Sequence, residues 1–226
     1  FTFAKKAGIY TMTAFGSETH FVTKDGEYPI FSADGKRIFI QTGGTYFGNL
    51  TKSLHSLNLQ GNDKRTHFTS KYANRLVPSP DNKWIAFSQL HKAYVAPMIV
   101  TGQKVNLDNK TKAFPVAQIA KDAGVNLHWS PDSKKVLWTL GDEYFSNEIK
   151  DRFTFLDGSP EKTPELTTKG TKINLTIKTD KPSGRIAFTN ARIITMDNEQ
   201  VIENGTILVK DNRIEAIGNA SDVRVP

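Results

Sequence analysis

The sequence predicts an all-β protein, with about three and a half blades of a β-propeller followed by a small β-hairpin or sandwich segment. Two observations support this prediction. One turn motif recurs three times within residues 1–178, and a tight hairpin lies within residues 185–226, after a linker at 179–184. Apolar and polar residues alternate as in strands throughout, and no long helical period interrupts them.

The repeated motif is a Ser-x-Asp turn between a short apolar strand and a second strand. Its copies begin at Ser32, Ser79 and Ser130, which are 47 and 51 residues apart. A four-stranded propeller blade takes about 40–50 residues, so each copy should mark one blade. A β-sandwich with short strands is the alternative, but a sandwich does not require one turn motif at nearly constant spacing.

The chemistry of each motif favours a hairpin turn. Pro presets φ at the start of a turn, and an Asp side chain accepts a hydrogen bond from the backbone two residues further on. Gly35, Asn82 and Ser133 occupy the next turn position, where Gly and Asn tolerate positive φ. A strand of β-branched and aromatic residues follows each turn, as expected for the second strand of a blade.

The outer half of each blade should be a second hairpin. Residues 53–69 fit this pattern, with Gly61-Asn62 as the turn. Residues 8–23 match them but have no inner hairpin before them, so we expect the chain to open half-way through a blade. The outer strands of the later blades are expected at 93–98, 114–120 and 142–149, with a long Lys- and Asn-rich loop between the first two.

The motif copies resemble the repeats of TolB-like and WD-type propellers, in which a Ser-Pro-Asp-Gly-Lys run opens the blade. The stretch from Ser79 to Phe87, Ser-Pro-Asp-Asn-Lys-Trp-Ile-Ala-Phe, carries the resemblance most fully. It extends over residues 1–178 and implies the fold. Propellers of this kind serve many binding roles, and some are fused to enzymes.

The C-terminal run from Arg185 to Gly218 has a different pattern. A strand at 186–196 precedes a hairpin whose two-residue Asp211-Asn212 loop favours a primed turn. This run, with NARIIT and VIENGTILVKDNRIEAIG, resembles the opening of amidohydrolase-superfamily enzymes such as imidazolonepropionase-like and dihydroorotase-like hydrolases. In that family it begins a β-sandwich beside the catalytic barrel. Propeller repeats followed by this run resemble a bacterial group of amidohydrolases that carry a TolB-like propeller.

The resemblance implies a metal-dependent hydrolase whose active site lies beyond Pro226. In the family, a His-x-His pair in the barrel holds a divalent metal, typically zinc, which lowers the pKa of a bound water. No such residue falls in this chain, so we expect no catalytic, cofactor-binding or metal-binding residues here and a non-catalytic fragment with a truncated sandwich. A periplasmic propeller that binds proteins or peptides is the alternative function, and a propeller fused to a serine peptidase is a third.

The histidines do not replace the missing ligands. They are His20, His55, His67, His91 and His128, and no two lie within four residues. Each is expected to pack on a strand or turn. His128, beside Trp129 at the entrance of a blade, is the candidate for a role at the mouth of the propeller, with surface packing as the alternative.

Composition narrows the function classes further. With no cysteine, the chain has no disulfide, thiolate metal site or cysteine nucleophile. The net charge of +7 is scattered over turn lysines and arginines, which argues against a nucleic-acid partner. No apolar run reaches membrane-spanning length. The family resemblance implies a periplasmic or secreted location in a bacterium.

A partial propeller also has implications for partners. Closed propellers of this type contain about six or seven blades, so an arc of fewer blades leaves a bare edge. We therefore expect self-association through the open propeller or sandwich edges, or a protein or peptide partner that covers them.

Overall fold

The computed structural model describes residues 7–44, 48–122, 124–198 and 200–226. The chain divides into two compact units, Phe1–Asn174 and Leu175–Pro226. Within the described residues every regular element is a β-strand except one 3₁₀ turn, η1 (Ile149–Asp151). No helix in that part of the chain is long and apolar enough to cross a membrane.

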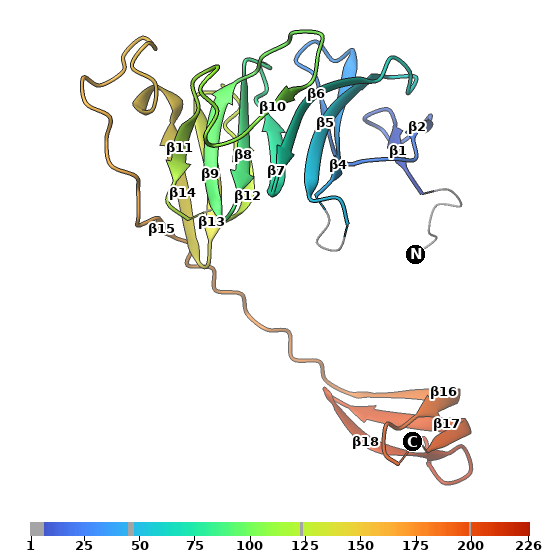
Figure 1. Cartoon of the computed structure of the whole chain (residues 1–226). Helices are drawn as coiled ribbons and strands as arrows, with labels where there is room; N and C mark the ends of the chain where they lie inside the picture. The colour runs from blue at the N-terminus through green and yellow to red at the C-terminus, as the bar shows by residue number, and fades with distance from the viewer. Residues whose placement is uncertain (1–6, 45–47, 123, 199) are drawn as a thin grey trace. The chain divides into compact units, whose positions relative to one another are not determined.

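The first unit is a series of antiparallel sheets that follow one another in chain order (Figure 1). A two-stranded sheet comes first, and three sheets built around four antiparallel strands follow it. The two-stranded sheet is β1 (Ile9–Thr11) and β2 (His20–Thr23). The second sheet contains β3 (Glu27–Phe31), β4 (Arg37–Gly43), β5 (Thr51–Asn58) and β6 (Arg65–Lys71). The third contains β7 (Ala73–Pro78), β8 (Trp84–Gln89), β9 (Lys92–Pro97) and β11 (Ala117–Ala120). The fourth contains β12 (Val125–Trp129), β13 (Lys135–Leu140), β14 (Glu143–Glu148) and β15 (Thr171–Lys172).

Three apolar cores lie between successive sheets, and each core joins one sheet to the next. Ile9 and Val22 of the first sheet pack with Ile38 and Ile40 of the second. Another core joins the second sheet to the third, and the last joins the third to the fourth. Four-stranded antiparallel sheets that repeat along the chain and pack on their neighbours in chain order are the arrangement expected of propeller blades. The predicted fold class, an all-β chain with a partial propeller, is confirmed.

The three motif turns have nearly the same geometry. The serine Oγ of each turn donates a hydrogen bond of 2.6 Å to the aspartate Oδ1 two residues on. It accepts one of 2.9 Å from the N–H that opens the next strand. Gly35, Asn82 and Ser133 have φ values of 67°, 56° and 60°, so the predicted positive φ is present at all three positions.

Residues at this positive-φ position also connect successive blades. Asn82 Oδ1 accepts a hydrogen bond of 2.6 Å from the N–H of Ala33, and Ser133 Oγ accepts one of 3.0 Å from the N–H of Asp81. The second and third motif turns are therefore each tied to the turn of the preceding blade.

Replacing Ser79 with Ala should destabilise the first unit by about 1–3 kcal/mol, because the buried Trp84 N–H loses its acceptor. Ser79 is fully buried. Ser130→Ala is the matched control, since Ser130 makes the same bonds in a more exposed turn and water can replace them. Urea unfolding of both variants checks the prediction, and equal losses would contradict it.

The long loop between β9 and β11 does more than connect two outer strands. Its short strand β10 (Val105–Asn106) pairs in parallel with β6, on the outer edge of the preceding sheet. Leu107 is fully buried in the core between the second and third sheets. The loop covers an edge strand that would otherwise present unpaired backbone groups.

The second unit is a three-stranded antiparallel sheet of β16 (Arg185–Ile194), β17 (Val201–Lys210) and β18 (Arg213–Asn219). The predicted strand and hairpin are therefore both present. Asp211 and Asn212 form the two-residue loop, and Asp211 has the positive φ of 54° that a primed turn requires at its first central position.

Candidate functional site

The histidines are placed on strands and turns, as the sequence predicts. His55 on β5 is bonded through its two ring nitrogens to Thr42 Oγ1 and Thr66 Oγ1, each at 2.9 Å. Burial lowers the pKa of His55 to about 4 and also lowers the pKa of His67 on β6. No group of three or more His, Asp or Glu side chains with metal-binding geometry occurs among the described residues.

His128 lies exposed on β12, at an edge of its sheet. Its Nδ1 is 2.5 Å from the carbonyl oxygen of Asn126, and its ring lies 6.5 Å from that of Tyr144. These contacts orient the imidazole locally, and the described residues bring no second titratable group into hydrogen-bond contact with it. The proposed role at the propeller mouth gains no support from this arrangement.

The first strands of the three larger sheets, β3, β7 and β12, share an irregularity. Each lies at an edge of its sheet, and each has a register shift near its start. Tyr28, Arg75 and Asn126 stand at these shifts, each four residues before its motif serine. Bulges redirect side chains and are common beside functional sites, which makes this set of positions the first place to look for a site.

At two of these positions the side chains meet across neighbouring blades. The guanidinium carbon of Arg75 lies 3.6 Å from the centre of the Tyr28 ring. Lys52 Nζ on β5 lies 5.8 Å from the same ring and 2.5 Å from Glu27 Oε1. We call Glu27, Tyr28, Gln41, Lys52 and Arg75 the inner cluster.

Gln41 joins the inner cluster through the backbone. Gln41 lies on β4 and is the cross-strand partner of Glu27 on β3. Its Oε1 accepts a hydrogen bond of 3.0 Å from the N–H of Leu76, next to Arg75. Gln41 is fully buried, and the Lys52 side chain is 5% exposed. Buried polar and charged side chains at the border of an apolar core are costly unless they are paired.

Some buried polar atoms in and beside the inner cluster lack a hydrogen-bond partner among the described residues. Of the four buried side-chain atoms that have no partner among the described residues, three lie in or beside the inner cluster, namely Gln41 Nε2, Arg75 Nε and Ser70 Oγ. Ser70 on β6 is the cross-strand partner of Lys52. Buried donors without partners are rare in folded proteins, and an ordered water or a bound ligand is the usual acceptor for them.

Sequence reasoning missed the inner cluster, although one signal for it was present. Aligning the repeat four residues before each motif serine places Tyr28, Arg75 and Asn126 in one column. A polar or aromatic column on an inner strand would have pointed to this site.

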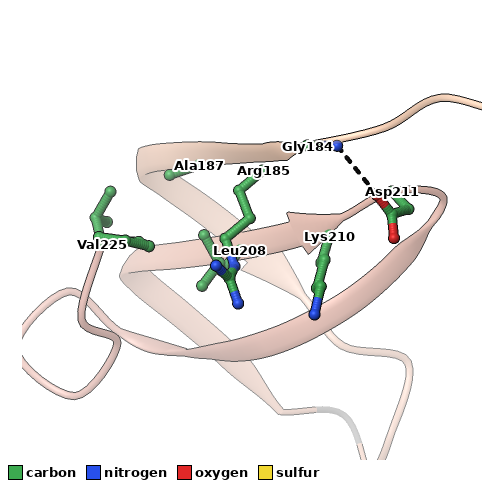
Figure 2. A pocket seen from close by; sticks show the side chains of 8 residues that line it. Gly184, Arg185, Ala187, Leu208, Lys210, Asp211 and Val225 are labelled. Carbon is green, nitrogen blue, oxygen red and sulfur yellow. Dashed lines mark hydrogen bonds between the residues drawn. The ribbon is translucent and has the colours of Figure 1, made fainter.

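A separate hollow of about 470 Å³ lies on the second unit (Figure 2). Ala187, Leu208 and Val225 supply apolar surface, and Arg185 and Lys210 add charge (Figure 2). Arg185 Nε donates a hydrogen bond of 2.8 Å to Glu215, which lowers the pKa of that carboxyl group. Its lining contains no hydroxyl, imidazole or thiol side chain, so it has the character of a packing surface rather than a reaction site.

No family model and no curated protein matches the chain. Several solved structures are similar to parts of it. Oligogalacturonate lyase from Vibrio parahaemolyticus has a TM-score of 0.38 at 11% identity, over 59% of this chain and 38% of its own. The β-propeller domain of the Trilobed protease from Pyrococcus furiosus has a TM-score of 0.36 at 16% identity, over 84% and 56% of the two chains. Acylaminoacyl peptidase from Pyrococcus horikoshii has a TM-score of 0.31 at 13% identity, over 79% and 30%.

The chain therefore spans between 30% and 56% of the length of these three structures. One of them is named as a propeller domain, and another is a peptidase. At these identities and TM-scores the similarities say nothing about function. The propeller assignment rests on the sheets and the cores between them.

Proposed function

We propose that this chain is the non-catalytic part of a metal-dependent amidohydrolase, in which the propeller is an accessory or binding scaffold. The hydrolysis of a C–N bond, a cyclic amide or an ester would take place in a barrel outside this chain. There a divalent metal, zinc in this proposal, would activate a water molecule. A periplasmic or secreted location in a bacterium belongs to the same proposal.

One feature of the second unit supports it. The three-stranded sheet has an apolar face on which six side chains are neighbours in register: Ile186, Phe188, Ile207, Val209, Ile214 and Ile217. Within the described residues four of them are between 44% and 63% exposed. A contiguous apolar face of this kind requires a second layer, and a sandwich whose other strands come from the rest of a hydrolase domain would supply one.

The decisive experiment uses the full product of the gene that encodes this chain. We expect a His-x-His pair within about forty residues after Pro226, about one or two bound zinc ions per chain, and hydrolysis of amides or lactones that chelation abolishes. A Gly-x-Ser-x-Gly sequence in place of the histidine pair would instead indicate a serine peptidase. A full-length protein with neither zinc nor hydrolase activity would favour the alternative, a binding propeller.

A substitution at Phe188 tests whether the apolar face is covered. Phe188→Ala should change the unfolding free energy of this 226-residue chain by less than about 0.5 kcal/mol, because the side chain is 55% exposed. In the full-length protein it should cost about 3–5 kcal/mol, because the ring would then be buried. Equal effects in the two proteins would contradict the sandwich.

A further inference from the structure

We propose that the inner cluster is a binding site for a carboxylate, in which Arg75 and the Gln41 amide act as the hydrogen-bond donors. The proposal concerns the propeller alone and does not depend on the hydrolase. It follows from three properties of the cluster: its unbalanced charge, its unpartnered donors and the fixed position of Arg75.

The charge of the cluster is unbalanced by one. Lys52 and Arg75 are cations, and Glu27 is the one anion in contact with either of them among the described residues. Glu27 is already paired with Lys52 at 2.5 Å, so the guanidinium of Arg75 has no counter-ion in the part of the chain that the structure describes. A ligand that carries a single negative charge would restore the balance.

The donors of the cluster also lack acceptors. Within the described residues Arg75 makes no hydrogen bond or ion pair, and its Nε is buried. The Nε2 of the fully buried Gln41 has no partner either, although its Oε1 is held by the N–H of Leu76. The guanidinium of Arg75 and the NH2 group of Gln41 can only donate hydrogen bonds, so the missing component is an acceptor.

The position of Arg75 suits a planar anion. Its guanidinium carbon lies 3.6 Å from the centre of the Tyr28 ring, and this cation–π contact uses the face of the guanidinium rather than the N–H groups at its edge. A guanidinium fork matches the two oxygens of a carboxylate with parallel hydrogen bonds. Tyr28 is 43% exposed, and Glu27 lies on an open hollow of about 560 Å³, so one side of the cluster faces solvent, whereas Gln41 Nε2 and Arg75 Nε lie beneath the surface.

Calorimetric titration of the full 226-residue chain at constant ionic strength tests the proposal. Sodium acetate and sodium glutarate are the small probes, and neutral acetamide is the uncharged comparison. A tetrapeptide with a free C-terminal carboxylate, compared with its C-terminal amide, separates a peptide source from a small-molecule source. We expect saturable binding of the carboxylates and none of acetamide or of the amidated peptide. Tighter binding of the free peptide than of glutarate would assign the site to peptide termini, and the reverse to small acids.

Arg75→Gln should weaken carboxylate binding about ten- to a hundredfold, because a charge-assisted hydrogen bond is lost. Arg213→Gln is the matched control, since it removes the same charge from an exposed position on the second unit. Should Arg75→Gln unfold, as circular dichroism would report, Arg75→Lys keeps the charge and loses the fork, and should also bind at least about tenfold more weakly.

Three results would overturn the proposal. One is the absence of carboxylate binding, with ordered water filling the cluster in a crystal structure. Another is equal binding of acetate and acetamide. The third is equal carboxylate affinity of folded Arg75 variants and Arg213→Gln.

Discussion

Replacing Trp138 with Ala should destabilise the first unit by about 3–5 kcal/mol, the largest loss that we expect from a single side chain. Trp138 on β13 is 2% exposed, and its ring stacks on Phe145 with 5.4 Å between the ring centres. It lies in the core that joins the third sheet to the fourth. Because each blade packs only on its neighbours, a cavity there weakens the attachment of a whole blade.

Chemical unfolding followed by far-ultraviolet circular dichroism measures the loss, and amide hydrogen exchange locates it. Exchange should accelerate first in β12, β13 and β14. Phe15→Ala is the control, since Phe15 is 99% exposed and its removal should change stability by less than about 0.5 kcal/mol. A cost below about 1 kcal/mol for Trp138→Ala would mean that this core is not closely packed.

The stability of the first unit should fall as the pH is lowered from about 6.5 to about 4, because His55 resists protonation in the folded state. Burial, with smaller contributions from Lys64 and His67, lowers its pKa from 6.5 to about 4. Between these values the unfolded chain binds more protons than the native protein, so stability decreases as pH falls. At about 1.4 kcal/mol per pKa unit, the loss from His55 reaches no more than about 3 kcal/mol. The lowered pKa of His67 acts in the same direction.

Urea unfolding between pH 7 and pH 4.5 measures this slope. The carboxyl groups with lowered pKa values, such as Asp34 and Glu148, lose their contribution only as the pH falls through about 4.5 and below, so they do not obscure it. His55→Gln should remove most of the slope, and replacing His67 as well should remove much of the remainder. An unchanged slope in the double variant would show that other groups cause it.

The turns could be predicted because their chemistry is local. Ser79, Asp81 and Asn82 lie close together in the chain, and their hydrogen bonds and positive φ follow from residue types at fixed offsets. The same reasoning located the Asp211-Asn212 hairpin loop. The pairing of β10 with β6 could not be predicted in this way, because a two-residue strand has no periodicity and its partner lies over thirty residues earlier.

The inner cluster combines features that the sequence predicts with contacts that it does not predict. By itself, the sequence determined that the chain is all-β, that blades repeat and that each repeat turns at Ser-x-Asp. Only the tertiary structure decided that Arg75 of one blade stacks on Tyr28 of the preceding blade, next to a buried Gln41 and Lys52. The physical reason is that a turn depends on hydrogen bonds within a few residues. Contacts between blades depend instead on how two sheets pack. They also depend on bulges, which bring together side chains that are far apart in the chain.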